Sequence, residues 1–170
     1  MKFPDKLKFS VITISDRASR GEYEDLSGPE ITRMIQGFFS AKAVKVVVAN
    51  EIIPDEPDLL RSRIRNCKDE GINVVFTTGG TGLGPRDITP EVIRPMLDKE
   101  IPGIMEMIRV KYGLNRPAAL VSRSVAGLSG QTLIYCLPGS LKAVDEYTLE
   151  ILPTLIHSIK MVLAIDDHHD

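Results

Sequence analysis

The sequence predicts an α/β protein: a single domain whose doubly wound, mainly parallel sheet carries helices on both faces. Three observations support this fold class. Short β-branched runs alternate along the chain with segments whose apolar residues recur every three or four positions. The strand-like runs are almost continuously apolar, which is typical of strands buried on both faces. Polar or glycine-containing residues follow several of these runs, at the strand ends where such sheets bind ligands.

The strands and helices can be placed by their composition and boundary residues. Apolar, β-branched runs bounded by turn residues predict strands over residues 8–14, 44–53, 73–78, 118–122 and 131–137. Helical spacing predicts helices over residues 27–38, 59–67, 89–97, 102–112 and 140–162. Ser27, Thr89 and Ser140 are expected to cap three of these helices, Ser27 through a Ser-x-x-Glu capping box. Pro153 is expected to kink or restart the last helix.

Length, charge and cysteine content restrict the class of protein. A chain of 170 residues suits one domain with a sizeable core, here residues 1–165. The net charge of −2 argues against binding nucleic acid through a basic surface, and no apolar stretch is long enough to span a membrane. Cys67 and Cys136 lie in apolar patterns, which favours a reduced, cytoplasmic protein. The tail 166–170 contains two histidines and is expected to be solvated rather than metal-binding.

Residues 77–91 form the most informative stretch of the chain. They read Thr-Thr-Gly-Gly-Thr-Gly-Leu-Gly-Pro-Arg-Asp-Ile-Thr-Pro-Glu, directly after the apolar run 74–76. Glycines let a backbone bend tightly and approach an anion closely. The stretch is neither a Walker A loop nor a dinucleotide-binding fingerprint, because Pro85 and Arg86 occupy the positions that those motifs reserve for other residues. A tight turn without a ligand remains an alternative, and the adjacent Arg86 and Asp87 favour a binding site.

Two carboxylates are predicted to lie near this glycine-rich loop. Asp55 and Asp87 follow the second and third strands, and a divalent cation would let them share a site with a phosphate. Mg²⁺ prefers such hard oxygen ligands and shares its shell with substrate phosphates. Asp55 could instead be a turn residue, and Asp87 could pair with Arg86 or cap a helix.

Neutral donors and one further cation complete the candidate site. Ser122, Ser124 and Ser140 can donate hydrogen bonds, while Arg123 can grip an anion or simply lie on the surface. The sequence pattern contains no Ser-His-Asp or Cys-His order. An enzyme of this kind would act by positioning and charge stabilisation, as phosphoryl and nucleotidyl transferases do.

The chain resembles a known family through a set of motifs that covers roughly residues 7–163. The resemblance is to the molybdopterin adenylyltransferases of the MogA type, which are similar to the gephyrin G domains and their plant counterparts. The Gly-Gly-Thr-Gly…Arg-Asp-x-Thr-Pro-Glu stretch is specific to this superfamily. The matching segments are residues 14–17, 25–29, 78–82, 86–91, 120–124 and 137–140.

The resemblance implies a reaction, a cofactor and an assembly. It implies a MogA-like fold, commonly a homotrimer, that transfers AMP from ATP to molybdopterin with Mg²⁺ and releases pyrophosphate. The product then receives molybdate or tungstate, which implies a molybdenum-insertion protein as a partner. Neither nucleic acid nor a membrane is implied as a partner.

The resemblance also assigns roles to residues of this chain. Asp55 and Asp87 match the catalytic and metal-binding acids. The other matched positions are substrate-binding, with Arg86 as the candidate cation for pyrophosphate: Ser15, Asp16, Thr78, Gly79, Gly80, Thr81, Gly82, Arg86, Ser122, Arg123, Ser124, Pro138, Gly139 and Ser140.

Two other functions stay open at the level of the sequence. Relatives of the MoaB type share the fold and much of the motif, so the chain could bind the pterin without adenylyltransferase activity. The long segment 16–29 favours the MogA type, whereas Leu141 stands where relatives often carry proline. The third possibility is a structural oligomer, in which the loops at the strand ends are ordinary turns that bind no ligand.

Overall fold

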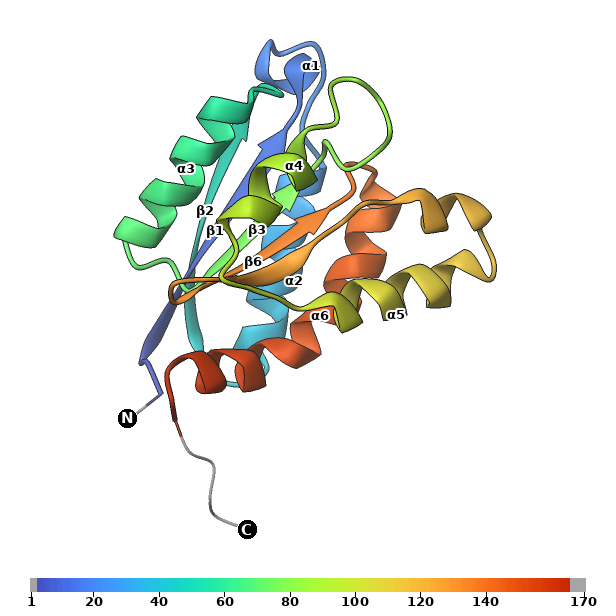
Figure 1. The fold of residues 1–170 in the computed structure, drawn as a ribbon. Coiled ribbons are helices and arrows are strands. Elements are labelled where there is room, and N and C mark those ends of the chain that lie inside the picture. The colour runs from blue at the N-terminus through green and yellow to red at the C-terminus, as the bar shows by residue number, and fades with distance from the viewer. Residues whose placement is uncertain (1–2, 166–170) are drawn as a thin grey trace.

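The fold is a six-stranded sheet between two layers of helices, shown in Figure 1. A computed structural model describes residues 3–165; the predicted tail 166–170 lies outside them. The strand order is β2-β1-β3-β6-β5-β4, with β2, β1, β3 and β6 parallel and the β6–β5 and β5–β4 pairs antiparallel. The strands are β1 (Lys6–Ile14), β2 (Lys45–Ile53), β3 (Val74–Thr78), β4 (Lys99–Glu100), β5 (Ala126–Ser129) and β6 (Thr132–Leu137).

Helices connect the parallel strands and cover both faces of the sheet, so the predicted fold class is confirmed. The α-helices are α1 (Asp16–Ser19), α2 (Ser27–Ser40), α3 (Pro57–Asp69), α4 (Thr89–Ile93), α5 (Pro102–Gly113) and α6 (Leu141–Val162). Two short 3-10 helices are η1 (Arg94–Met96) and η2 (Pro117–Val121). Within residues 3–165, no helix combines the length and apolar character that crossing a membrane requires.

Alternating side chains of the strands divide the interior into two cores. Phe9 and Val11 of β1 join the core beneath α2, α5 and α6, whereas Ile12 and Ile14 join the core beneath α3 and α4. Both faces of β1 are therefore apolar, because helices cover the strand from either side. In the larger core, Phe76 of β3 stacks on a tyrosine of β6 with ring centroids 5.4 Å apart.

One predicted strand is wrong, and two strands were not predicted. The segment 118–122 lies in and just beyond the 3-10 helix η2, which starts at Pro117. The antiparallel strands β4 and β5 escaped prediction because β4 is two residues long and β5 is built largely of small residues. Gly127 is required in β5, since a Cβ there would lie 2.6 Å from the carbonyl oxygen of Lys99.

Two of the three predicted helix caps are wrong. The hydroxyl groups of these two residues donate hydrogen bonds to backbone carbonyls of the loops at the sheet edge. Ser27 Oγ donates to the Gly139 carbonyl at 3.0 Å, while Asp25 accepts from the first amides of α2. Thr89 Oγ1 donates to the Gly79 carbonyl at 2.9 Å. Ser140 does cap α6, accepting from the Ala143 amide. Helix α6 continues through its internal proline, so that residue does not restart the helix.

The two cysteines are free and buried, which yields a prediction about their reactivity. Burial raises the pKa of the Cys136 thiol to about 12, and burial also raises the pKa of Cys67. Because the thiolate is the reactive form, we expect Cys136 to resist thiol reagents at mildly alkaline pH until the protein unfolds. A Cys67→Ser variant titrated with a chromogenic disulfide isolates Cys136. Labelling faster than global unfolding would contradict the prediction.

Candidate functional site

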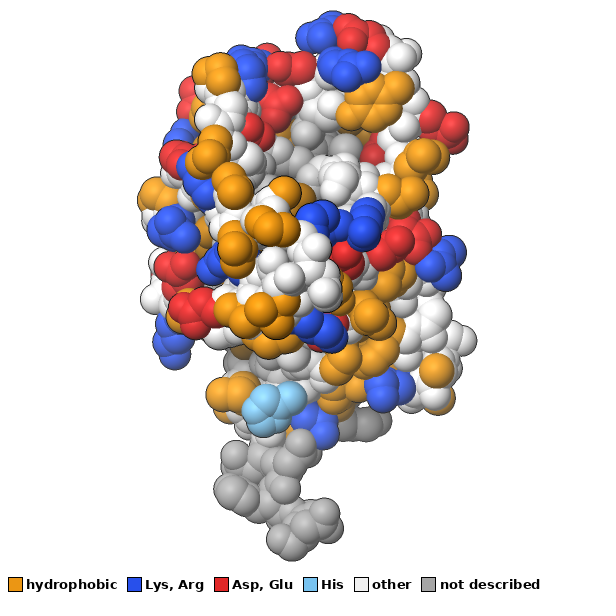
Figure 2. Space-filling model, turned by 90° about the vertical axis from the view of Figure 1, so that its right-hand side faces the viewer, with side chains coloured by type: hydrophobic (Ala, Val, Ile, Leu, Met, Phe, Trp, Pro, Cys, Tyr) orange, Lys and Arg blue, Asp and Glu red, His pale blue; other side chains and the backbone are white. Residues whose placement is uncertain are grey.

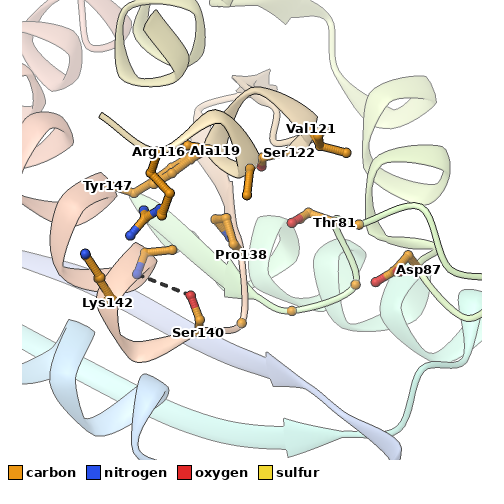
Figure 3. Close-up of a pocket in the computed structure, with 16 residues that line it drawn as sticks. Thr81, Asp87, Arg116, Ala119, Val121, Ser122, Pro138, Ser140, Lys142 and Tyr147 are labelled. Atoms are coloured by element: carbon orange, nitrogen blue, oxygen red, sulfur yellow. Dashed lines mark hydrogen bonds between the residues drawn. The ribbon is translucent and has the colours of Figure 1, made fainter. Parts of the chain in front are cut away.

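A cavity of about 790 Å³ opens at the carboxyl ends of the parallel strands β3 and β6. Figure 3 shows it bounded by the loop after β3, the 3-10 helix η2, the loop after β6 and the first turns of α6. This is the edge of a doubly wound sheet where ligands bind. Its lining residues are Gly79, Gly80, Thr81, Gly82, Asp87, Arg116, Ala118, Ala119, Val121, Ser122, Pro138, Gly139, Ser140, Lys142, Ala143 and Tyr147.

The glycine loop, residues 79–84, follows a path that side chains would block. Gly79 has φ +107°, and a Cβ there would lie 2.2 Å from the carbonyl oxygen of Ile14 at the end of β1. Gly80 has φ +65°, and its Cβ would lie 2.4 Å from Thr89 Oγ1. The backbone therefore passes directly between the end of β1 and the start of α4, which only glycine permits.

Amides of this loop are available to an anion. Within residues 3–165, no acceptor is hydrogen-bonded to the N–H groups of Gly80, Thr81 or Gly82. These three residues also line the cavity. Because unpaired backbone amides need a partner, consecutive ones at a cavity wall suit phosphate oxygens.

Asp87 is held by the glycine loop that precedes it. Its Oδ2 accepts a hydrogen bond of 2.7 Å from the Gly84 amide. A Cβ at Gly82 or Gly84 would approach that same oxygen to 2.9 or 2.8 Å, so the loop wraps the carboxylate closely. Among residues 3–165 no donor is bonded to its Oδ1, and the residue lines the cavity.

Asp55 lies near Gly80 of the glycine loop and belongs to a hydrogen-bond network with Asp16 and Arg86. The Asp16 amide donates to Asp55 Oδ2 at 2.8 Å, and the Asp55 amide donates back to Asp16 Oδ1 at 3.1 Å. Arg86 donates to both carboxylate oxygens of Asp16, at 2.8 and 2.9 Å. A Cβ at Gly80 would lie 3.5 Å from Asp55 Oδ1. The structure thus brings both predicted acids to the glycine loop.

Asp55 and Asp16 have pKa values that their surroundings shift in opposite directions. Burial raises the pKa of half-buried Asp55, although the hydrogen bond from the Asp16 amide opposes this effect. The hydrogen bonds from Arg86 lower the pKa of Asp16. The ionised form is therefore less favoured at Asp55 than at Asp16, and a nearby cation would favour the charged form of Asp55.

The remaining predicted residues fall into three groups. Ser122 and Ser140 line the main cavity, and Ser122 Oγ shares a hydrogen bond of 2.8 Å with the buried Ser124. Ser15 and Thr78 line a second cavity of about 250 Å³, and Gly139 lines both cavities. Five predicted residues line neither cavity: Asp16, Asp55, Arg86, Arg123 and Ser124.

Arg123 points toward the back of the glycine loop. Its guanidinium donates to the carbonyl oxygens of Gly82 at 2.7 Å and Asp87 at 2.9 Å, and it pairs with Glu91. We predicted that Arg123 could bind a ligand anion. In the structure its guanidinium is instead hydrogen-bonded to backbone carbonyls and paired with Glu91.

Three polar or charged lining residues were not identified from the sequence: Arg116, Lys142 and Tyr147. Figure 3 shows the two cations at the end of the cavity opposite Asp87. Arg116 pairs with Glu146 of α6. Lys142 lies two residues after Ser140, in the first turn of α6, so the Pro-Gly-Ser motif could have indicated it. Arg116 offered none, because it precedes the segment wrongly predicted as a strand.

The first loop glycine yields a prediction about stability. We expect Gly79→Ala to lower the free energy of unfolding by about 1–3 kcal/mol or more, since its φ is left-handed and its Cβ meets backbone. Gly37→Ala is the matched control, because a Cβ at Gly37 of α2 meets nothing within 4 Å. It should stabilise by up to about 1 kcal/mol. Urea denaturation of both variants measures this difference, and equal stabilities would refute it.

Comparisons with known proteins agree with this geometry. The family described as "Probable molybdopterin binding domain" matches residues 10–157. A molybdopterin adenylyltransferase of Helicobacter pylori strain J99 is 35% identical over 159 residues, covering 93% of this chain and 89% of that protein. Gephyrin of Dictyostelium discoideum is 39% identical over 89% of this chain. The chain spans only 22% of that gephyrin and 26% of the cinnamon protein of Drosophila melanogaster.

Solved structures give the same result. The molybdopterin biosynthesis enzyme MoaB of Thermus thermophilus superposes with a TM-score of 0.82 at 40% identity, covering 93% of this chain and 97% of that one. A tungsten cofactor synthesizing MoaB of Pyrococcus furiosus superposes with a TM-score of 0.82 at 35% identity, covering 94% and 99%. Because the family match spans most of the described residues, the chain belongs to the molybdopterin-binding domain family.

Proposed function

We propose that this protein is a molybdopterin adenylyltransferase that transfers AMP from ATP to the terminal phosphate of molybdopterin and releases pyrophosphate. One observation carries the proposal: Gly80, Thr81 and Gly82, whose amides have no acceptor within residues 3–165, line a cavity together with Asp87, and Asp55 Oδ1 lies close to Gly80. Adenylyltransferase relatives of similar length support it. The reaction belongs to molybdenum cofactor biosynthesis.

The chemistry requires positioning rather than a protein nucleophile. The terminal phosphate of the pterin attacks the α-phosphorus of ATP, and pyrophosphate leaves. The loop amides hold the phosphate oxygens and stabilise the negative charge that grows on them. Ala118, Ala119 and Val121 would give the bound pterin an apolar wall.

The two carboxylates fit a magnesium ion that a nucleotide brings with it. Asp55 and Asp87 each keep one oxygen without a protein donor, and residues 3–165 contain no cluster of three or more potential ligand side chains. Mg²⁺ commonly binds through one or two carboxylates plus substrate phosphates, which matches this sparse set. When bound, it would neutralise charge on the triphosphate.

Arg86 would complement the charge of the departing pyrophosphate. It lies at the exposed rim of the glycine loop, and its salt bridge with Asp16 keeps it there. Asp16 in turn is bonded to Asp55, so the cation and the predicted metal ligand belong to one network. Ser122, Ser140 and the loop 138–140 would contact the pterin.

We also propose a cytoplasmic homotrimer that passes its product to a molybdenum-insertion protein. Self-association is supported by exposed apolar side chains on α5, on η2 and on the turn between them. Figure 2 shows apolar side chains gathered among charged ones on the face turned toward the viewer. The exposed apolar side chains of α5, η2 and the turn are Met107, Val110, Leu114, Leu120 and Val121.

A second candidate function is pterin binding without AMP transfer, which the resemblance to MoaB-type relatives leaves open. The comparisons do not favour it over AMP transfer, because the 40% identical Thermus MoaB is itself described as a molybdopterin biosynthesis enzyme. Incubation with ATP, Mg²⁺ and molybdopterin, followed by mass detection of the adenylylated pterin, separates the two functions.

Substitution of the loop acid tests the enzyme directly. Asp87→Asn keeps the shape of the side chain and its acceptor for Gly84 but removes the charge. We expect AMP transfer to fall by about a hundredfold or more, because the metal loses a ligand, while pterin affinity changes little. Single-turnover rates and fluorescence titration with pterin measure the two effects. Equal turnover in variant and parent would exclude Asp87 from the mechanism.

The raised pKa of Asp55 predicts how magnesium affinity depends on pH. Burial raises the pKa of Asp55 in the folded state, so the folded protein binds the carboxyl proton more tightly than the unfolded chain does. Ionisation of Asp55 therefore lowers the free energy of unfolding as pH rises through the pKa of the folded state, and this loss of stability disappears as pH falls. Magnesium must displace the proton. We therefore expect affinity to weaken on acidification beginning above pH 3.8, the ordinary value for aspartate.

Asp55→Asn supplies the control for this pH dependence. The amide oxygen can still accept from Asp16, so the metal-free variant should be at least as stable as the parent at neutral pH. Its magnesium affinity should be low and nearly independent of pH. Calorimetric titrations across the acidic range measure both proteins, and an identical pH profile in the two would disprove the role of Asp55.

A further inference from the structure

Arg123 connects the two ends of the segment that carries the predicted metal ligand. Its Nε donates to the carbonyl of Gly82 at 2.7 Å, and a second guanidinium nitrogen donates to the carbonyl of Asp87 at 2.9 Å. Its own amide donates to the carbonyl of Thr81 at 3.1 Å. One residue from a distant part of the chain therefore holds the segment 81–87 at three backbone positions.

A fourth contact fixes the guanidinium itself. Arg123 pairs with Glu91 on the first turn of α4, the helix that follows the loop. The arginine thus joins the loop to the helix on its far side. A planar fork with several donors can satisfy two carbonyls and a carboxylate together, whereas the point charge of a lysine cannot reproduce that geometry.

The contacts of Arg123 affect where the Asp87 carboxylate points. Its carboxylate is anchored by the Gly84 amide, and its amide donates to the Gly84 carbonyl at 3.0 Å. Both bonds join residues within the segment 82–87, so they determine the shape of the segment but not where it lies relative to the cavity. Arg123 contributes to the placement relative to the cavity, since it ties both Gly82 and Asp87 to a residue outside the segment.

The structure offers other cations for direct contact with substrate. Arg116 and Lys142 line the cavity, whereas Arg123 does not. The Arg123 side chain is 31% exposed, and its donors are directed to the loop backbone and Glu91. A role in gripping the substrate would require it to abandon these bonds.

We propose that Arg123 is a positioning residue that aims the Asp87 carboxylate at the metal-bound nucleotide by holding the backbone of the glycine loop. The inference rests on the proposed function, because it takes Asp87 as a metal ligand. It replaces the expectation that Arg123 binds the substrate.

Manganese binding tests the proposal without relying on turnover. Mn²⁺ substitutes for Mg²⁺, and its free concentration can be followed by electron paramagnetic resonance in the presence of ATP. We expect Arg123→Ala to weaken Mn²⁺ binding by about tenfold or more, the usual effect of losing a partner that orients a metal ligand. Pterin affinity should stay within about twofold of the parent, because Arg123 does not line the cavity.

Two further variants keep the experiment interpretable. Arg94→Met removes a surface arginine paired with Glu100 outside the cavity, and it should bind Mn²⁺ as the parent does. Arg123→Lys keeps the charge but not the fork, so it should remain impaired even if the alanine variant fails to fold. Added guanidinium, at concentrations too low to denature, should restore Mn²⁺ binding to Arg123→Ala and not to Asp87→Asn.

The outcomes separate this inference from the proposed function. If the parent binds no Mn²⁺ and transfers no AMP, the proposed function fails. If the parent is active but folded Arg123→Ala or Arg123→Lys binds Mn²⁺ equally well, the positioning role alone is overturned. Loss of pterin affinity with unchanged Mn²⁺ binding would also overturn it, by returning Arg123 to the substrate.

Discussion

The close passage of the glycine loop between the end of β1 and the start of α4 is the constraint on which the site depends. Gly79 lies against the Ile14 carbonyl, and Gly80 lies against Thr89 Oγ1. Along this path three consecutive cavity-lining residues have no acceptor for their amides within residues 3–165, and the loop lies beside Asp55. A side chain at either glycine would force the backbone away from β1, and the amides and the acid would separate.

Buried hydroxyl groups hold the neighbouring loops in register with that passage. Thr78 donates to the carbonyl of Pro138 at 2.9 Å, while Ser27 and Thr89 donate to the carbonyls of Gly139 and Gly79. Each bond satisfies a backbone carbonyl near the sheet edge, where an unpaired polar group would be costly. These bonds position the loop after β3 and the loop after β6, which form two walls of the cavity.

Much of the fold and the core of the candidate site could be predicted because those features are local in the chain. Strand runs such as 74–78 are marked by composition, and the glycine loop is marked by its spacing. The approach of Asp55 to the loop was also predictable, since the carboxyl ends of parallel strands share one edge. Strand β5 and helix η2 were not, because pairing partners and exposure decide between short conformations of similar propensity.

The sequence by itself determined the alternation of strands and helices, the glycine loop and the identity of its acids, because each is written in neighbouring residues. Only the tertiary structure decided what the long side chains do. Arg123 reaches Gly82 across 41 positions of sequence, and Arg86 reaches Asp16 across 70. An arginine next to a serine motif gives no sign of whether it faces a ligand or a carbonyl. That choice depends on which backbone groups folding leaves within reach of its donors.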